Sequence, residues 1–342
     1  MAREKLLIAL ARLYFIFLFG WLVLRFLFGD RWALLFLFNT LAEFLFLPLI
    51  PITLVAWKFR ARDLALGSVI AIVAATILFG EMFTPKISPM TATPTLRVMT
   101  YNMLGHTNHA DAVVATIRES DADVIAIQEL NPNAANALQR DLLREYPYQT
   151  LDPHDGVAGL GVISRFPLRL STDTLPGRWI GAPQLLQLDW QGTPVTILHV
   201  HTIPTTAFID FIRMPQSIEA SIRNREENMR ALAAYVAAHR DEPIIGTGDF
   251  NMTDQNTSYR IIASELRDTW REAGWGLGHT FPSTNLNAMP LPSLANSSLF
   301  MWLVRIDYIF HSSHWRAVSA DLGNWDGQSD HRPVIVRLVL EE

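Results

Sequence analysis

The stretch Pro243-Ile244-Ile245-Gly246-Thr247-Gly248-Asp249-Phe250-Asn251 passes within a few residues from an apolar run to a carboxylate and an amide. Such a run predicts a buried strand that Asp249 closes. The same change recurs along the chain: Asn102 follows Leu96–Met99, Glu129 follows Asp123–Gln128, Asp307 lies within Arg305–Tyr308, and Asp330 and His331 precede Val334–Val336. Polar groups at the strand ends of an open α/β sheet point into one crevice. Oxygen ligands converging with a histidine indicate an enzyme with a hard cation and a general base.

Three long apolar segments occupy the first 84 residues. They run from Leu6 to Phe28, from Trp32 to Trp57 and from Leu64 to Phe83. A helix of about 20 apolar residues spans the roughly 30 Å core of a bilayer, so each segment is long enough. A secretory signal has a single apolar stretch and does not account for three in series. The sequence predicts a transmembrane anchor over residues 1–84, with a buried helical core domain as the alternative.

Basic residues indicate how this anchor is oriented. Arg3 and Lys5 precede the first segment, and Lys58, Arg60 and Arg62 lie between the second and the third. Positively charged loops tend to stay in the cytoplasm, so the third segment is expected to emerge on the other side. We expect a multi-pass protein of the cytoplasmic membrane, with the rest of the chain outside the cytoplasm.

A linker rich in Pro and Thr covers residues 85–94, and residues 95–342 form the remaining domain. That domain contains 19 Arg, no Lys and 28 Asp and Glu, which gives a net charge of about −9. Proteins that bind nucleic acid mainly through its phosphates usually carry the opposite sign, so this charge counts against strong non-specific DNA binding. The absence of cysteine excludes disulfide and thiolate chemistry.

Hydrophobic periodicity predicts a layered α/β domain over residues 95–342. Strands are expected at Leu96–Tyr101, Asp123–Gln128, Gly159–Ser164, Gln184–Trp190, Pro194–His201, Ile244–Gly246, Ile306–His311, Trp315–Ser319 and Val334–Leu340, and helices at Ala110–Glu119, Ala134–Tyr146 and Asn224–Arg240. Strands mixed with helices along the whole domain favour this class over a bundle or an all-β sandwich. About 250 residues can fill one core, so no further division is expected.

Glu129, Asn102 and the pair Asp249 and Asn251 are the candidates for binding a cation or a phosphate. Glu129 is the best direct ligand for a hard ion such as Mg²⁺, and Asn102 could ligate or orient beside it. Asp249 and Asn251 are two residues apart, so in an extended segment both side chains point the same way. One can hold an attacking water while the other binds a phosphate oxygen or the metal. Solvated strand ends and an Asx turn after Gly248 are the structural alternatives.

Asp330 and His331 join a carboxylate to an imidazole that titrates near neutral pH, as general-base chemistry requires. A third group must fix the tautomer of His331, and Asp307 is the candidate. By itself, Ser329-Asp330-His331 is also typical of a surface turn.

His199 and His201 alternate on one face of a predicted strand. Two histidines at this spacing can bind zinc. Because cysteine is absent and carboxylates and amides are abundant elsewhere, we favour His201 as a phosphate-contacting group and His199 as its support.

Taken together and in this order, the fragments resemble the endonuclease/exonuclease/phosphatase superfamily, whose fold is that of deoxyribonuclease I, from about Leu96 to Leu340. Each motif alone is common, and the ordered set is specific. The matching positions are Asn102, Ile127-Gln128-Glu129, Gly161–Pro167, His201 with Thr202–Pro204, the Gly-Asp-x-Asn motif at Gly248–Asn251, His279–Pro282, Asp307 and Asp330-His331. No acidic partner for His201 is evident in the sequence.

The resemblance implies a four-layer α/β sandwich, two mixed β-sheets flanked by helices, and metal-assisted in-line attack of water on phosphorus. It implies that His331, oriented by Asp307, takes the proton of the water that Asp249 positions.

The same resemblance implies Mg²⁺, with Mn²⁺ as a substitute, held by Glu129 with Asn102 and Asp330 nearby. The cation would neutralise charge on the phosphoryl oxygens, and Asn251 and His201 would stabilise them.

The expected activity is that of a membrane-anchored Mg²⁺-dependent phosphoesterase acting on phosphodiester or phosphomonoester bonds. A lipid or lipid-linked substrate is slightly favoured, since the apolar stretches Ala207–Met214 and Leu299–Val304 permit a lipid-contacting rim beside the bilayer. An extracytoplasmic nuclease, with Arg223, Arg225 and Arg230 as its contact face, is the second reading. A binding module that kept the fold and lost the chemistry is the third, and no obligate protein partner is inferred.

Overall fold

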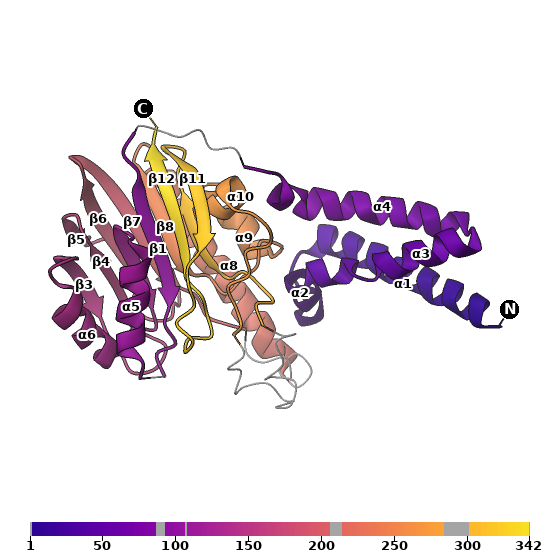
Figure 1. Ribbon diagram of the computed structural model, residues 1–342, viewed down its shortest axis with the longest axis horizontal. Coiled ribbons are helices and arrows are strands. Elements are labelled where there is room, and N and C mark those ends of the chain that lie inside the picture. The colour runs from indigo at the N-terminus through magenta and orange to yellow at the C-terminus, as the bar shows by residue number, and fades with distance from the viewer. Residues whose placement is uncertain (1, 87–92, 107, 206–213, 284–300, 342) are drawn as a thin grey trace.

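The computed structural model describes residues 2–86, 93–106, 108–205, 214–283 and 301–341. Two six-stranded sheets lie face to face with helices on their outer faces, and an N-terminal helical domain extends from one side of this sandwich (Figure 1). The predicted four-layer sandwich of two mixed sheets is therefore confirmed.

The first sheet has the strand order β11-β12-β1-β2-β4-β3. Its strands are β1 (Leu96–Asn102), β2 (Val124–Gln128), β3 (Tyr148–Asp152), β4 (Leu160–Ser164), β11 (Trp315–Leu322) and β12 (Val334–Leu340). β1 and β2 pair in parallel, and the other neighbours are antiparallel. Helices α5 (Ala110–Ser120) and α6 (Pro132–Leu142) cover the outer face of this sheet.

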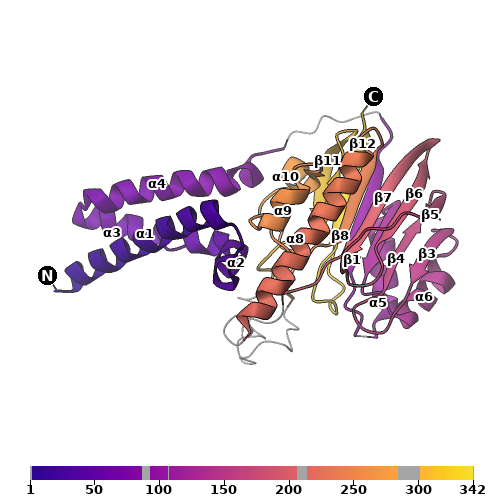
Figure 2. The ribbon, with the colours of Figure 1, turned by 180° about the vertical axis from the view of Figure 1, so that it is seen from behind.

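The second sheet has the order β5-β6-β7-β8-β10-β9. Its strands are β5 (Leu168–Leu170), β6 (Gln184–Trp190), β7 (Thr193–His201), β8 (Ile244–Asp249), β9 (Arg267–Asp268) and β10 (Asp307–His311). Here β7 and β8 form the parallel pair. Helices α8 (Pro215–Ala238) and α9 (Thr257–Ile262) cover the outer face, and the short α10 (Thr269–Ala273) lies beside β10 and β11 (Figure 2).

The central strands contribute side chains to two core layers, one between the sheets and one under the outer helices. In β1, Leu96 and Val98 pack between the sheets, whereas Met99 and Tyr101 pack under the outer helices. This follows from the strand period of two, which sends alternate side chains to opposite faces.

The N-terminal domain contains three stretches that are long and apolar enough to cross a membrane, namely Arg3–Phe28, Ala42–Phe59 and Arg62–Phe83. The domain comprises α1 (Ala2–Phe28), α2 (Ala33–Thr40), η1 (Ala42–Phe46), α3 (Leu49–Phe59), α4 (Arg62–Phe79) and η2 (Gly80–Phe83). The second stretch begins at Ala42 and not at Trp32 as expected. Its first residues instead form the separate helix α2, whose Phe36 packs against Ile218 and Ile222 of α8.

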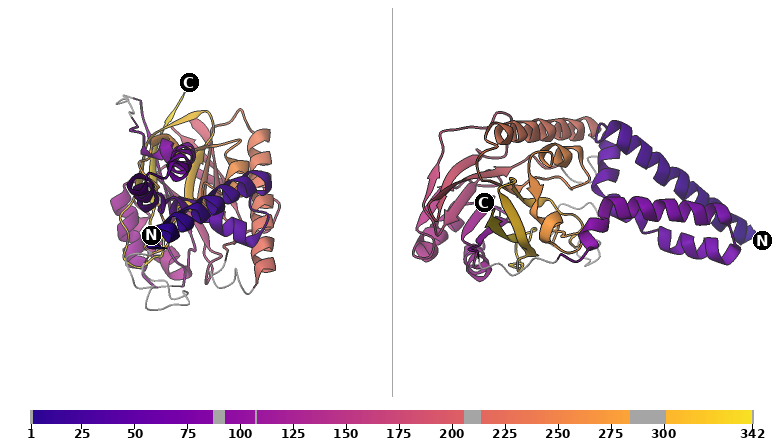
Figure 3. Two further views of the ribbon diagram at one scale, coloured as in Figure 1. Left: turned by 90° about the vertical axis from the view of Figure 1, so that its right-hand side faces the viewer. Right: turned by 90° about the horizontal axis from the view of Figure 1, so that it is seen from above.

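Both the N-terminus and the turn between α3 and α4 lie at the end of the helical domain that points away from the sandwich (Figure 3). The basic residues Lys58, Arg60 and Arg62 occupy that distal turn, and Arg12 binds Asp63 there with Nε 2.7 Å from the carboxylate. The α1–α2 connection lies at the opposite end, next to α8 and α9.

Asp30, in that connection, joins the helical domain to the sandwich. Its buried carboxylate accepts hydrogen bonds from Asn39 Nδ2 (2.7 Å) and from the backbone nitrogen of Thr257 (2.5 Å). One turn earlier, Arg25 Nη2 donates to Gln255 Oε1 at 2.7 Å. The chain segment that follows Asn251 is therefore bonded directly to the end of α1.

Replacing Asp30 with alanine is expected to lower the free energy of unfolding by about 1–3 kcal/mol, because the donors of Asn39, Asn256 and Thr257 lose a buried acceptor. Thermal unfolding of the full chain in detergent micelles measures this. Glu145→Ala, which removes an exposed ion pair with Arg118, is the control and is expected to cost less than about 1 kcal/mol. An equal loss in the two variants would contradict the structural role of Asp30.

Candidate active site

The candidate catalytic residues share the inner face of the sandwich and the same end of it. Along β8 the inner positions are Ile245, Thr247 and Asp249, so an apolar core gives way to polar side chains toward the strand's carboxyl end. The sheet register places Asp249 opposite both His201 of β7 and Asp307 of β10. The sequence-predicted residues of the second sheet are thus brought together by strand pairing.

Asp249 is the centre of this group. Its Oδ2 accepts a hydrogen bond from Asn102 Nδ2 (3.1 Å), and it lies 3.5 Å from His201 Nε2 and 3.8 Å from His331 Nε2. Its Oδ1 accepts from the backbone nitrogen of Asn251 at 2.9 Å. Burial opposes ionisation, yet the two imidazoles outweigh it and lower the pKa of Asp249. Asn102 reaches it from the first sheet, so the site spans both sheets.

His331 and Asp307 form a buried pair in which Nδ1 lies 2.8 Å from Asp307 Oδ2. The Phe281 ring lies 4.8 Å from the imidazole, centroid to centroid, and limits how it can turn. Burial opposes protonation of His331, but the contact with Asp307 prevails and raises its pKa well above the usual value. Asp330 lies outside this pair, with Oδ1 3.9 Å from His331 Nε2.

Glu129 lies immediately after β2 and is buried. Its Oε1 accepts from Asn102 Nδ2 (3.1 Å), and its Oε2 accepts from the backbone nitrogen of Gly105 (3.0 Å). Burial raises the pKa of Glu129. Glu129 (φ 59°) and Asn251 (φ 47°) adopt the left-handed backbone region that costs energy for residues other than glycine. Strain of this kind concentrates at functional sites.

Gly248 shows why the Gly-Asp-x-Asn motif begins with glycine. Its φ of +147° is unfavourable for other residues, and a Cβ atom there would collide with the carbonyl oxygen of Val200 on the adjacent strand β7. The missing side chain allows β8 to run close beside β7 while carrying Asp249 to the inner face.

His201 has the acidic neighbour that the sequence did not identify, namely Asp249. His199 lies deeper and is fully buried, with Nε2 2.8 Å from Gln128 Nε2 and Nδ1 3.2 Å from Gln184 Oε1. Burial lowers the pKa of His199 to about 3, so it is neutral at physiological pH. The two histidines do not converge on a zinc site within the part of the chain that the structure describes.

One group in the described residues has the geometry to bind a metal ion. A ligand atom from each of Asp249, Asp307 and His331 lies within 4.8 Å of the others, and all three residues are buried. Asp307 Oδ1 has no hydrogen-bond partner among the described residues, which leaves it free to ligate. Two carboxylates suit a hard cation. Glu129 adjoins this group through Asn102, and Asp330 adjoins it through His331.

Ser329 is a site residue to which the sequence reading gave no role. Its hydroxyl donates to the backbone oxygen of Asn102 (2.7 Å) and accepts from the backbone nitrogen of His331 (3.0 Å). It therefore fixes the loop that carries His331 to the end of β1. In the sequence, only its position directly before Asp330-His331 indicated a role at the site.

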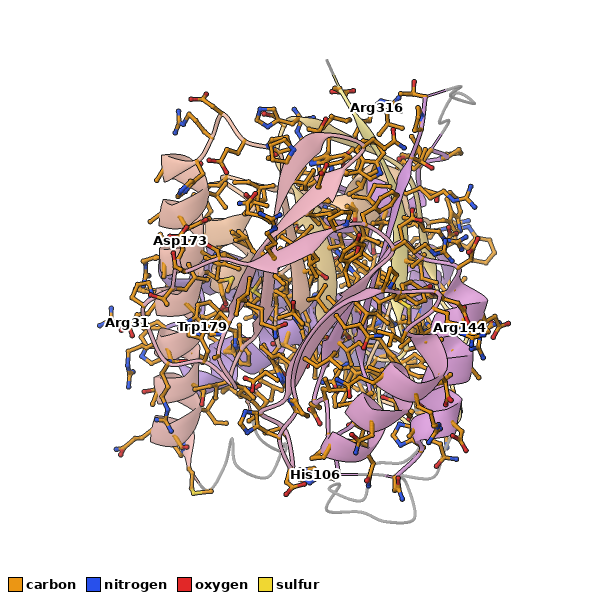
Figure 4. All side chains as sticks on the ribbon, turned by 90° about the vertical axis from the view of Figure 1, so that its left-hand side faces the viewer. Arg31, His106, Arg144, Asp173, Trp179 and Arg316 are labelled. Carbon is orange, nitrogen blue, oxygen red and sulfur yellow. The ribbon has the colours of Figure 1, made fainter. Side chains whose placement is uncertain are left out.

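The site lies at the end of the sandwich where the loop after β1 emerges. His106, next to Gly105 in this loop, is exposed at that end, away from Arg316 at the opposite end (Figure 4).

Comparison with known proteins supports a family assignment. A sequence profile described as the endonuclease/exonuclease/phosphatase family matches residues 99–331. Comparison with curated proteins by sequence returned no match.

Solved structures show the same fold. An endonuclease/exonuclease/phosphatase from Beutenbergia cavernae superposes with a TM-score of 0.53 at 20% identity, covering 72% of each chain. Truncated Caenorhabditis elegans TDP2 gives 0.54 at 14% identity, covering 72% of this chain and 98% of its own. D. rerio TDP2 complexed with a single-strand DNA product gives 0.53 at 18% identity, covering 71% and 98%. The profile match extends over most of the chain and includes every candidate residue from Asn102 to His331. The chain therefore belongs to the endonuclease/exonuclease/phosphatase family.

Proposed function

We propose that this protein is a membrane-anchored, Mg²⁺-dependent phosphoesterase that hydrolyses a lipid or lipid-linked phosphate ester. The observation that carries the proposal is the His331–Asp307 pair, whose Nε2 faces Asp249 across 3.8 Å. A water molecule about 2.8 Å from both atoms would be held by the carboxylate and deprotonated by the imidazole.

In the proposed reaction, the water oxygen forms a bond to phosphorus while the ester P–O bond breaks. His331 Nε2 takes the water's proton, and the leaving oxygen is protonated from solvent. In the neutral form of His331, Asp307 accepts from Nδ1, so the free lone pair lies on Nε2, and Asp307 stabilises the imidazolium that forms afterwards.

Glu129 would hold the cation, with Asn102 and Asp330 beside it. Mg²⁺, or Mn²⁺ in its place, supplies neutralisation of the charge that develops on the phosphoryl oxygens. His201 and Asn251 would contact those oxygens, and His199 would support His201 from two positions earlier on β7. The alternative ligand set is the buried group of Asp249, Asp307 and His331.

The helical domain supports placement of the enzyme in the cytoplasmic membrane. With α1, α3 and α4 crossing the bilayer, the basic distal turn would lie in the cytoplasm and the sandwich on the other side. The bilayer is thus the proposed partner, and the tether favours a substrate that resides in it.

A nuclease is the second candidate, because D. rerio TDP2 of the same fold is known with a DNA product. Two of the three arginines expected to contact DNA already have partners within the protein. Arg225 is fully buried and donates to the backbone oxygen of Ile203, and Arg230 pairs with Glu226.

Two apolar stretches, Ala207–Met214 and Leu299–Val304, were expected to form a lipid-contacting rim. Of these, residues 207–213, 299 and 300 lie outside the described residues. Trp302 packs against Trp325 and does not project as a free rim.

Hydrolysis by the full chain in detergent micelles or nanodiscs tests the proposal. We expect turnover of bis-p-nitrophenyl phosphate and of mixed phospholipid vesicles with Mg²⁺, and its loss on chelation with EDTA. Double-stranded DNA, offered at low and moderate salt, is expected to stay intact. DNA cleavage that fades with salt would replace the lipid assignment with a nuclease. Absence of turnover on every substrate by a folded protein would support the binding module.

A further inference from the structure

A cavity of about 640 Å³ lies where the helical domain meets the sandwich, and none of the candidate catalytic residues lines it. Its walls come from the α1–α2 connection, from α8 and from α9. Three arginines line it, Arg31, Arg223 and Arg260. Its lining also includes three acids and two aromatic residues, namely Asp30, Glu219, Glu226, Phe28 and Trp32.

The three arginines are available to a ligand. Each is exposed, and within the described ranges none has a carboxylate at ion-pairing distance. Arg260 is oriented by donating from Nη2 to Thr257 Oγ1 at 3.1 Å. The Arg31 guanidinium lies over the Trp32 ring, 5.6 Å from its centroid. Guanidinium groups that line one cavity without a carboxylate partner are suited to a phosphate, which they can bind through paired N–H donors.

A second arginine-lined hollow, at α5 and α6, differs in that two of its three arginines, Arg118 and Arg140, are paired with carboxylates, whereas the third, Arg144, has no ion pair among the described residues. There Arg118 lies 2.8 Å from Glu145 and Arg140 lies 2.6 Å from Asp141. The junction cavity thus differs in that none of its three arginines has a carboxylate partner within the described residues.

The cavity also lies at the level of lipid headgroups if α1 crosses the membrane. The apolar span ends at Phe28, and the preceding Phe26 is 84% exposed, as a lipid-facing residue would be. Trp32 is 43% exposed beside the cavity, and tryptophan is enriched at membrane–water interfaces. Basic pockets between transmembrane helices bind phosphate-bearing headgroups on the cytoplasmic side of membranes, and the same ion-pair chemistry is open to a pocket at the other membrane surface.

We propose that this cavity binds the headgroup of an amine-bearing phospholipid, with its phosphate on Arg31, Arg223 and Arg260 and its ammonium on Glu219. Of the acids that line the cavity, Asp30 is bonded to Asn39 and Thr257, and Glu226 pairs with Arg230. Glu219 has no ion-pair partner within the part of the chain that the structure describes. This inference rests on the membrane anchoring proposed above and is independent of the hydrolytic chemistry. A bound headgroup touches both the helical domain and α9, so it fixes the sandwich on the bilayer surface.

Native mass spectrometry of the full chain in detergent, titrated with dioctanoyl phosphatidylethanolamine, tests this proposal. The titration uses the His331→Ala background so that no lipid is hydrolysed. Arg31→Gln and Arg223→Gln are each expected to weaken one lipid adduct roughly fivefold, and the double variant roughly 25-fold. Glu219→Gln is expected to weaken phosphatidylethanolamine and to leave dioctanoyl phosphatidylglycerol unchanged.

Arg144→Gln, on the opposite side of the sandwich from Arg31 (Figure 4), is the matched control and is expected to bind like the parent. A lipid bound at the catalytic site would still be detected in the cavity variants. The expected result is therefore the loss of one lipid adduct from the mass spectrum, and not of all adducts. Unchanged binding by the double variant would overturn the site. Equal affinity for inorganic phosphate and for phosphatidylethanolamine would overturn the lipid assignment, because the phosphate alone would then account for binding.

Discussion

Replacing His331 with alanine is expected to lower kcat by about 10²–10⁴-fold while the protein keeps its fold, because general-base catalysis contributes a factor of this size. Nδ1 of the His331 imidazole is held by the Asp307 carboxylate, and Nε2 faces Asp249. Initial rates on bis-p-nitrophenyl phosphate, with circular dichroism and the Tm of the same samples, separate lost chemistry from lost structure.

Asp307→Asn is the sharper companion variant. An amide nitrogen facing Nδ1 would donate to it, which places the imidazole proton on Nε2 and leaves that nitrogen unable to accept the water's proton. We expect a loss of rate close to that of His331→Ala, and little further loss when both are changed, since the two residues act as a unit.

His239→Ala is the control, because the His239 ring lies at the end of α8, where it bonds to the backbone carbonyl of Tyr235 and stacks on the Tyr235 ring, away from the candidate site. Parent-like activity in His331→Ala would remove the residue from the reaction and with it the proposed mechanism.

The strands that form the core could be predicted because their side chains pack in apolar layers on both faces of the sheets, which gives the sequence a recognisable hydrophobic pattern. Gln184–Trp190 and Val334–Leu340 have the predicted bounds, and β8 continues three residues beyond the expected Gly246. The extension was missed since Thr247 and Asp249 are polar, although both lie on the inner face. Polar side chains that face the space between the sheets mark the end of the sandwich where the candidate active site lies.

Segments whose contacts lie outside the sheets were predicted less well. The helix expected at Asn224–Arg240 begins at Pro215, because Ile218 and Ile222 pack on Phe36 of the helical domain and not on the sandwich. The predicted helix Ala134–Tyr146 ends at Leu142. The edge strands β3 and β5 were missed, since partly exposed edges show no clean apolar alternation.

The site residues could be named from the sequence, but their contacts could not. That His201 adjoins Asp249 depends on the parallel register of β7 and β8, and that Asn102 bridges Glu129 and Asp249 depends on how the two sheets face each other. No local pattern encodes a distance between sheets.

Asp249→Asn is expected to lower kcat at saturating Mg²⁺ by about 10²–10³-fold, with only a small change in the Mg²⁺ concentration that gives half-maximal rate. Oδ2 of the carboxylate contacts Asn102, His201 and His331, and Oδ1 accepts from the backbone nitrogen of Asn251, so an amide cannot keep both of its ends as acceptors. Glu129→Gln is expected to raise the half-saturating Mg²⁺ concentration at least about tenfold, with a smaller change in kcat at saturating Mg²⁺. Glu145→Gln, which is exposed, controls for the loss of one negative charge.

The comparison of these two variants decides between the two ligand sets. If Glu129 holds the cation, its loss is partly restored by more Mg²⁺, because the His331–Asp307 pair and the water-binding carboxylate are intact. If Asp249, Asp307 and His331 hold it, Asp249→Asn would weaken Mg²⁺ most and Glu129→Gln would resemble Glu145→Gln. That outcome would also remove His331 as the general base, since an imidazole nitrogen bound to the ion cannot accept a proton. Glu129 would then serve to orient Asn102 alone, consistent with its bond to that amide.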